Sequence, residues 1–399
     1  MDERAYELER TLKRYRAELL ESVVPFWERH AVDDASGGIN TCIADDGSVI
    51  SRDKYMWSQL RAVWTFSALY NRIEPRPEWT DIARGIYEFC AAHGRDEEGR
   101  WVFCTSPEGE IKEGATSIYA DGFAIIGLSE FARATDDEGA IRLALETYEN
   151  VQERLAEPGS YGTAPYDIPE GAKAHGVAMI FSHAFGELAS YLDDEVIWEA
   201  ATHHSDEVLD AFLRPDDGLV REYVTLDGSL IDSPQGRAVV PGHAIESMWF
   251  QLHLMRETGE TDRVGRAIEC IRRHIEFGWD EELGGIFLAG DSSMDRAGES
   301  WWSWAETKLW WPHTEALYAV LLAHEISGDD GFLEWFRKVD EYSFSHYPVA
   351  EHGEWRQKLG RDGQPITDVV ALPVKDPFHL PRALIWCIDV LERLCGGEG

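Results

Sequence analysis

The chain has 399 residues, of which 44% are hydrophobic and 12% aromatic, so it holds enough apolar side chains for a large buried core. Its 74 acidic residues outnumber the 37 basic ones, and the formal charge of −37 would repel phosphate backbones and anionic membranes. The composition therefore argues against nucleic acid or a membrane surface as a partner.

The amino-terminal stretch MDERAYELERTLKRYR mixes charged and apolar residues without an uninterrupted hydrophobic run. It is therefore neither a signal peptide nor a membrane anchor, and we expect a cytoplasmic protein. Six cysteines are scattered without a CxxC pair, which favours buried free thiols over disulfides or a metal site. Sixteen tryptophans are more than packing alone requires, and some of them are candidates for stacking on a sugar ring.

Apolar residues at positions i, i+3, i+4 and i+7 predict twelve helices, and no Pro/Ser-rich linker divides the chain. Six of them start roughly 60 to 70 residues apart, and most of these six are followed by a partner after a short turn. Six such pairs can close into a double ring of inner and outer helices, so we expect one all-α domain over residues 1–399. The predicted helices lie near residues 5–30, 54–73, 77–94, 116–135, 138–156, 174–191, 194–213, 242–258, 260–278, 305–326, 329–347 and 376–395.

The segments between the helical pairs have a different pattern, with alternating apolar residues and Gly/Asp turns. This pattern predicts short β-hairpins in the long connections. In a closed helical ring these connections would gather at one rim, where loops usually shape the mouth of a pocket. The four clearest examples are DEEGRWVFCTSPEGEI, DGLVREYVTLDGSL, EELGGIFLAG and EHGEWRQKLGRDG.

Polar and aromatic residues gather at the first turns of the predicted inner helices. KYMWSQLR places Trp57 and Arg61 four residues apart on one helical face, and SIYADGFAIIGL does the same with Tyr119 and Phe123. Arg61 is a candidate for binding a sugar oxygen, although an arginine in isolation is more often part of a surface salt bridge.

Histidines recur at the same places. In FSHAFGEL, His183 lies in an apolar run, where a lone histidine is usually a core residue. In PGHAIESMWF, proline and glycine mark a helix start, and Glu246 lies three residues after His243, where it could orient the imidazole or bind substrate. Histidine at the start of three inner helices favours a shared site over packing. The remaining two stretches are KLWWPHTEAL, with Trp310, Trp311, His313 and Glu315, and PFHLPR, with His379 and Arg382.

Several chemistries lack their sequence patterns. No HExxH occurs, and His313 and Glu315, two residues apart, point to different helical faces, so we expect no metal site. GxGxxG after a strand, GxxxxGK[ST] and GxSxG are also absent, which argues against nucleotide binding and a serine hydrolase. We expect an enzyme without a cofactor.

The stretches DKYMWSQLRAVW, PGHAIES, KLWWPHTEAL and PFHLPR, in this order and spacing, resemble the motifs of the N-acylglucosamine 2-epimerase superfamily over nearly the whole chain. That superfamily includes N-acetylglucosamine 2-epimerases, cellobiose 2-epimerases and aldose-ketose isomerases. The resemblance implies an (α/α)6 barrel with no required metal and a small sugar as substrate.

By the same resemblance, His243 and His379 would be the two catalytic acid/base residues. Other residues would bind the sugar or line the pocket. N-acetylglucosamine epimerases of animal type carry asparagine where this chain has His183, whereas cellobiose epimerases and isomerases carry histidine. The expected substrate-binding residues are Arg61, His183, Glu246, Trp57, Tyr119, Trp311, Glu315 and His313.

Histidine suits proton removal from C2 of a ring-opened aldose, because its pKa lies near neutrality. Return of the proton to the opposite face of C2 would give an epimer, and return to C1 would give a ketose. A glycoside hydrolase that uses Glu246 and Glu315 is a second possible class, and a non-catalytic sugar-binding protein is a third. We expect a homodimer only from the frequency of dimers among soluble enzymes.

Overall fold

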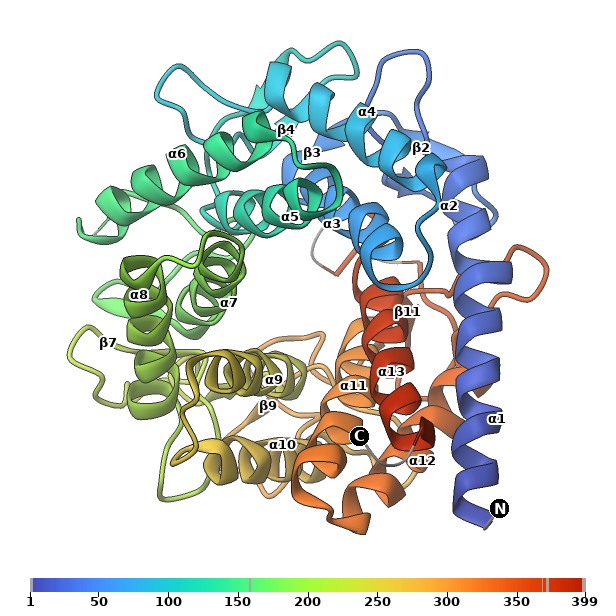
Figure 1. Cartoon of the computed structure of the whole chain (residues 1–399). Coiled ribbons are helices and arrows are strands. Elements are labelled where there is room, and N and C mark those ends of the chain that lie inside the picture. Colours follow the sequence, from blue (N-terminus) through green and yellow to red (C-terminus); the bar gives the residue numbers. More distant parts are fainter. Residues whose placement is uncertain (1–2, 158, 368, 371–372, 397–399) are drawn as a thin grey trace.

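The computed structural model describes residues 3–157, 159–367, 369–370 and 373–396. Within these residues, twelve helical regions form an inner and an outer ring (Figure 1), which confirms the predicted (α/α)6 barrel. The inner ring consists of α3 (Met56–Arg72), α5 (Tyr119–Thr135), α7 (His175–Leu192), α9 (Pro241–Thr258), α11 (Trp310–Ser327) and α13 (His379–Gly396). The outer ring contains α4 (Pro77–His93), α6 (Glu138–Leu155), α8 (Glu195–Glu207) with the π-helix η2 (Val208–Phe212), α10 (Val264–Gly278) and α12 (Asp330–His346).

The two ends of the chain form the sixth pair. The first helical region comprises α1 (Glu3–Ala17), the π-helix η1 (Glu18–Val23) and α2 (Val24–His30), and α1 packs against α13. Figure 1 shows the first and last helices side by side, where they close the ring. The closed ring therefore contains helices from both ends of the chain.

The two rings differ in burial. In α11 every residue from Pro312 to His324 is buried, since an inner helix contacts other helices on all sides. In α6, only Ala140, Leu143, Ala144, Thr147 and Val151 are buried, a stripe at helical spacing that faces inward. The sequences of the outer helices are therefore amphipathic, whereas those of the inner helices are nearly continuous apolar runs.

Tight turns join inner to outer helices on one face of the barrel. Asp136 and Asp193 end α5 and α7 in the left-handed conformation, at φ of 55° and 54°. The next residue in each case, Asp137 or Asp194, caps the following helix by accepting hydrogen bonds from its first amides. This repeated Asp-Asp pair makes each turn two residues long.

Short strands lie at the opposite rim, but their pairing differs from the predicted local hairpins. Of the strands in the described residues, β1–β2 and β4–β5 pair within one connection, where isolated antiparallel bridges such as Leu213–Val220 and Trp279–Ile286 also occur. In the other ladders, the strand before an inner helix pairs with a strand after the next outer helix, so each ladder ties together the two ends of a helical pair. The strands are β1 (Cys42–Ile43), β2 (Val49–Ser51), β3 (Lys54–Tyr55), β4 (Cys104–Thr105), β5 (Ile111–Glu113), β6 (Ala172–Ala174), β7 (Tyr223–Thr225), β8 (Ala238–Val239), β9 (Gly290–Asp291), β10 (Lys308–Leu309) and β11 (Lys358–Leu359).

Two buried ion pairs fix equivalent strands of this rim. Lys54 in β3 and Lys308 in β10 are fully buried, and their ammonium groups lie 2.9 Å from Asp33 and 3.1 Å from Asp280. Loss of either aspartate would leave a buried ammonium group without its ionic partner, which is strongly destabilising. The predicted helix 305–326 starts only at Trp310 because Lys308 and Leu309 belong to β10.

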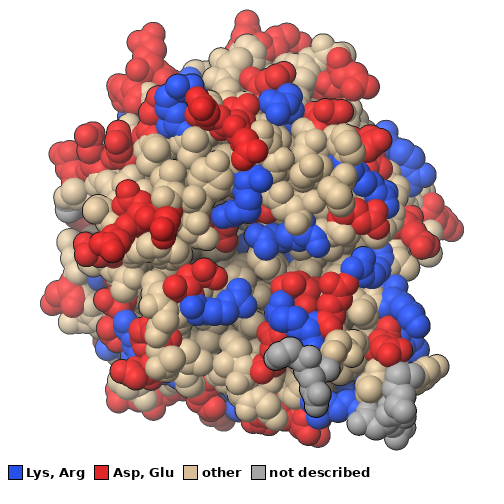
Figure 2. Space-filling model, viewed as in Figure 1, with Lys and Arg blue, Asp and Glu red and all other residues tan. Residues whose placement is uncertain are grey.

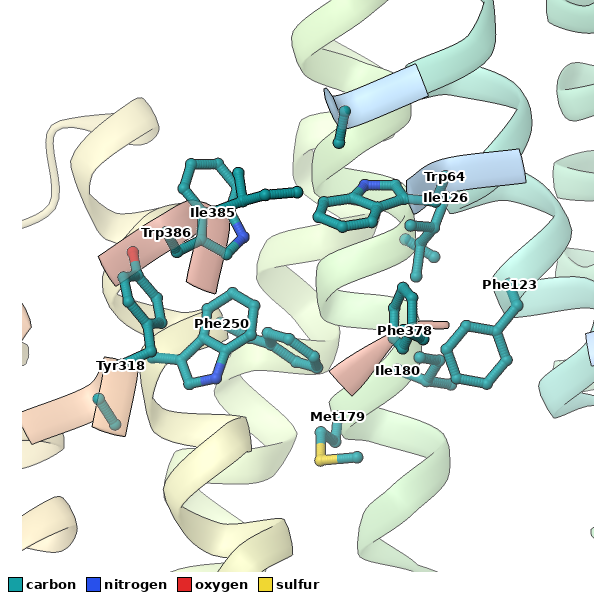
Figure 3. Close-up of a cluster of buried hydrophobic side chains, with 14 of the residues drawn as sticks. Trp64, Phe123, Ile126, Met179, Ile180, Phe250, Tyr318, Phe378, Ile385 and Trp386 are labelled. Carbon is teal, nitrogen blue, oxygen red and sulfur yellow. The ribbon is translucent and has the colours of Figure 1, made fainter. Parts of the chain in front are cut away.

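Hydrophobic side chains from the inner helices fill the middle of the barrel. Figure 3 shows Phe123, Met179, Ile180, Phe250 and Trp386 in this cluster, together with neighbours from the other inner helices. The first three also line a large cavity at the strand rim, and the last two line a smaller cavity. The apolar cluster therefore lies between two separate cavities.

Candidate active site

The larger cavity, called the main cavity here, has a volume of 930 Å³ and lies where the inner helices begin. This volume is within the usual range for small-molecule sites. The first turns of the inner helices and the strand-bearing connections together form its wall. Residues that line it include Trp57, Arg61, Tyr119, Tyr166, Glu222, His243, Glu246, Trp302, Trp311, Asp376 and His379.

His243, in the first turn of α9, forms the first of two histidine–carboxylate pairs. Its Nδ1 lies 3.0 Å from Oε2 of Glu222, and its side chain is 36% exposed. Because the carboxylate can only accept, Nδ1 carries the proton, and Nε2 is the atom left for proton exchange. Burial alone would lower the pKa of His243, but the charge and hydrogen bond of Glu222 outweigh it and raise that pKa. His243 is therefore suited to act as an acid.

His379, the first residue of α13, forms the second pair. Its Nδ1 lies 2.7 Å from Oε1 of Glu315, so the same reasoning leaves Nε2 as its reactive atom. The side chain is only 8% exposed. Burial, assisted by the positive charge of Arg61, lowers the pKa of His379 to about 3. His379 is therefore neutral near pH 7, the state in which its Nε2 can accept a proton.

A buried arginine links the carboxylates beneath His379. Arg382 donates hydrogen bonds to Glu246 and, at 2.8 Å, to Glu315. Glu246, Glu315 and His379 are close enough together to suggest metal ligands. However, one guanidinium nitrogen of Arg382 already contacts both carboxylates, and it supplies the positive charge that such a cluster needs. The arrangement fits a charge network that supports His379.

Arg61 provides a further polar anchor in the main cavity. Its Nη1 lies 2.9 Å from Oδ2 of Asp376, and its guanidinium carbon lies 4.0 Å from the ring centre of Phe123. The buried Nε of Arg61, Nε1 of Trp57 and Oδ1 of Asp376 have no hydrogen-bond partner among the described residues. Buried polar atoms of this kind normally have partners, so the hydrogen-bonding capacity of these three atoms is unused in this structure.

Trp311 lies between the two histidines. The centre of its indole is 5.1 Å from the His243 ring and 5.7 Å from the His379 ring. A side chain at Gly242 would approach this indole to 2.6 Å, so glycine is required there. Because both imidazoles contact one indole, they face the same part of the main cavity. Trp57, Trp301, Trp302, Trp310 and Trp311 line the main cavity, so about a third of the sixteen tryptophans are available to stack on a sugar.

Seven of the ten predicted site residues line the main cavity, and three do not. Glu315 is 1% exposed and lies behind His379, where it also accepts a hydrogen bond from Trp249 at 2.9 Å. We therefore reassign Glu315 from binding substrate to positioning His379. The seven are Trp57, Arg61, Tyr119, His243, Glu246, Trp311 and His379.

His313 and His183 need different corrections. His313 is fully buried, and its Nε2 accepts a hydrogen bond of 2.8 Å from the backbone N–H of Ile286. Gln59 in α3 is the equivalent residue, because KYMWSQLR and KLWWPHTE occupy the same positions of the repeat. Its side-chain oxygen accepts a hydrogen bond from the backbone N–H of Ile39. His313 is therefore a structural residue. His183 lies beyond the apolar cluster and lines the smaller cavity.

Glu222 and Asp376 were not predicted from the sequence, and Arg382 was given no role. Glu222 lies in the connection before β7, and its direction depends on the pairing of β7 with β6. Asp376 and Arg382 flank His379 in KDPFHLPR, so their proximity to a candidate base was a usable signal.

Comparison with known proteins agrees with this geometry. The family model of N-acylglucosamine 2-epimerase (GlcNAc 2-epimerase) matches residues 37–383. The chain belongs to this family. The N-acylglucosamine 2-epimerase of Bos taurus is 30% identical over 401 residues, which cover 98% of this chain and 94% of that protein.

Solved structures share the fold at lower identity. The cellobiose 2-epimerase of Bacillus thermoamylovorans has a TM-score of 0.84 at 21% identity, covering 96% of this chain and 99% of that one. A D-mannose isomerase has a TM-score of 0.76 at 17% identity, covering 97% of each chain. The family relatives are named epimerases, so the predicted family and the predicted isomerase class are confirmed.

Proposed function

We propose that the chain interconverts the C2 epimers of a ring-opened aldose, with N-acylglucosamine and N-acylmannosamine as the preferred pair. One observation carries the proposal: His243 and His379 face the same cavity, and each has a carboxylate at Nδ1. In both imidazoles this arrangement leaves Nε2 as the atom that exchanges a proton. The surroundings raise the pKa of His243 and lower that of His379. A reaction that takes a proton from one face and delivers it to the other needs such a pair.

The reaction begins with ring opening, because the C2 proton is acidic only when C1 is an aldehyde. Protonated His243 is suited to donate a proton to the ring oxygen and then to accept the proton of the C1 hydroxyl, so that it is protonated again when the open chain has formed. Arg61 carries the positive charge that would stabilise the oxygen at C1 as it becomes negative. The resulting open chain brings C2 within reach of both histidines.

Neutral His379 then removes the C2 proton, which leaves an enolate, or an enediolate where C2 bears a hydroxyl group. Glu315 stabilises the imidazolium that forms, as a carboxylate does behind a catalytic histidine in other enzymes. A proton from His243 to the opposite face of C2 completes the inversion. In the reverse direction the two histidines exchange roles.

The similarity to the bovine enzyme supports an N-acyl substrate, since that relative is named for N-acylglucosamine. His183, where animal-type enzymes carry asparagine, lies outside the main cavity and therefore gives no reason to reject such a substrate. The cavity of 930 Å³ has room for the acyl group beside Trp302 and Tyr166, whose rings lie 5.4 Å apart.

Aldose-ketose isomerisation is the second candidate, supported by the shared fold of the D-mannose isomerase. It needs the same base but returns the proton to C1. The hydrolase alternative loses support, because Glu315 does not line the main cavity and both of its proposed carboxylates are bound by Arg382.

Proton NMR in D2O tests the proposal. The purified protein is incubated separately with N-acetylglucosamine, N-acetylmannosamine, glucose, mannose, fructose and cellobiose. We expect deuterium at C2 and formation of the C2 epimer, fastest with the N-acetyl sugars. A ketose product would favour the isomerase candidate, and no exchange with any sugar would contradict both.

The predicted location and partners also remain proposals. No described helix is long and apolar enough to cross a bilayer. Figure 2 shows acidic side chains around the edge of one face, with basic ones interspersed nearer its middle. This mixed surface and the formal charge of −37 support a cytoplasmic protein that binds no nucleic acid. We also propose a homodimer, which size-exclusion chromatography with light scattering would test.

A further inference from the structure

A second cavity of 300 Å³ lies on the other side of the apolar cluster, near the ends of the inner helices. No step of the proposed reaction uses it. Its volume is at the lower limit for small-molecule sites and suits a monosaccharide-sized molecule. It is lined by Arg72, Arg133, Ser182, His183, Gly186, Glu187, Ser190, Trp198, Phe250, His253, Leu254, Arg256, Glu257, Trp386 and Asp389.

The three arginines of the second cavity do not make it an anion site. Arg72 and Arg133 both pair with the buried Glu130, and Arg256 lies 3.9 Å from Glu257. The inner helices end at this side of the barrel, and their carbonyl ends favour positive side chains and disfavour a bound anion. The arginines are therefore accounted for by the helix ends and their acidic partners.

His183 is the side chain that these contacts leave unexplained. It lines the second cavity, is only 7% exposed, and has no hydrogen bond to any described residue. Its ring stacks on Phe250 at a centroid distance of 4.1 Å, which fixes its plane. The His183 ring nitrogens are not among the buried polar atoms that lack a partner, so they reach the surface of the second cavity and are free to exchange hydrogen bonds with a ligand.

The chemistry of His183 indicates the class of ligand. Burial, reinforced by the charges of Arg382 and Arg72, lowers the pKa of His183 well below its ordinary value. A neutral imidazole offers one donor and one acceptor, which match the two functions of a hydroxyl group. His253, also in the lining, is neutral for the same reason of burial. Trp198 and Trp386 supply aromatic surface for the C–H groups of such a molecule.

We propose that the second cavity is a binding site for a neutral polyhydroxylated molecule of monosaccharide size, held by His183 and the adjacent tryptophans. The site is separate from the main cavity and does not depend on the activity proposed above. Its ligand need not be a substrate, because no described acid/base pair of the main cavity reaches it.

Glucitol is a suitable probe, because it lacks a carbonyl group and cannot be turned over. The ring Cε1–Hε1 signal of His183, assigned by its disappearance in His183→Gln, is followed by NMR during a glucitol titration. We expect a saturable shift in the wild type. Crystals soaked in glucitol should show the hexitol within hydrogen-bond distance of the His183 ring, a result that does not depend on any variant.

Two glycine variants provide the matched control. A side chain at Gly186 would enter ordinary contact with Leu254 at 3.6 Å and Trp198 at 3.8 Å, so Gly186→Leu should fill the second cavity without disrupting α7. At Gly85, on the exposed side of α4, a side chain meets nothing within 4 Å. We expect glucitol to bind at least about tenfold more weakly to Gly186→Leu and equally well to Gly85→Leu.

Three results would overturn the proposal. The first is the absence of a saturable shift in the wild type together with no glucitol in the soaked crystals. The second is equal binding by Gly186→Leu, and the third is a shift produced by inorganic phosphate at lower concentration than by glucitol. Exchange of deuterium at C2, measured on the same samples, is a separate readout, so failure of the proposed epimerase activity is distinguishable from failure of this site.

Discussion

The two histidine–carboxylate pairs contain the same side chains in the same contact, yet their imidazoles titrate in opposite directions. Burial lowers the pKa of His243, whose side chain is 36% exposed, but the charge and hydrogen bond of Glu222 together outweigh burial and raise that pKa. His379 is 8% exposed, and burial and the charge of Arg61 lower its pKa to about 3. Each carboxylate therefore sets which nitrogen reacts, whereas the protonation state follows from the balance between burial, nearby arginine and the charge of the carboxylate.

Removal of either histidine should have the largest effect. We expect His379→Asn and His243→Asn each to lower kcat by at least about 100-fold, the usual contribution of a general acid or base. The measurement is epimer formation from N-acetylglucosamine and from N-acetylmannosamine. C2 exchange in D2O should separate the two roles, because each variant retains one base and should exchange the proton of only one epimer. Loss of exchange from the same epimer in both variants would contradict a two-base mechanism.

Replacement of the carboxylate behind His379 should have the next largest effect. Glu315→Gln keeps one acceptor oxygen, which can serve Arg382 or Trp249 but not both because these two donate to different oxygens, and it lacks the charge that stabilises the imidazolium. We expect kcat to fall about 10- to 100-fold, as is common for partners that orient a functional histidine. An unchanged KM, measured in steady-state kinetics, would show that Glu315 does not bind substrate. A raised KM with normal kcat would contradict its assignment as a positioning residue.

Glu222→Gln should change the pH dependence more than the rate. Since Glu222 raises the pKa of His243, its neutral replacement should lower that pKa. A general acid is lost as the pH rises through its pKa, so the alkaline limb of the kcat profile should move to lower pH. The loss of kcat near neutral pH should be smaller than the roughly 100-fold loss expected for His243→Asn. An unchanged alkaline limb would show that His243 is not the acid.

Much of the fold could be predicted from the sequence, because helical pairs are local features. The twelve helices follow from apolar spacing, and α4 begins at the predicted residue 77. Strand pairing was less predictable. For example, β8 pairs with β9 across two intervening helices, so neither strand has its partner within its own connection. The start of α11 was predicted five residues too early, because the residues directly before it form β10, whose partner strand is also distant in the sequence.

The site was predictable where it uses first turns of inner helices, as for Arg61, His243 and His379. Glu222 was not predictable, because a loop carboxylate acquires its direction only from tertiary contacts. His313 was misassigned because histidine at a helix start was treated as a sign of catalysis. Comparison with Gln59 at the same position of the repeat would have indicated a structural role.

The reassignment of His313 gives the smallest predicted effect on activity. Glutamine should replace it well, since Gln59 accepts the equivalent backbone N–H in α3. We expect His313→Gln to retain near-normal kcat and His313→Ala to leave the N–H of Ile286 buried without an acceptor, which costs about 1–3 kcal/mol. Urea denaturation of the two variants measures the difference in the free energy of unfolding. A loss of kcat in His313→Gln comparable to that of His379→Asn would restore His313 to the active site, whereas the alanine variant alone could lose activity through instability.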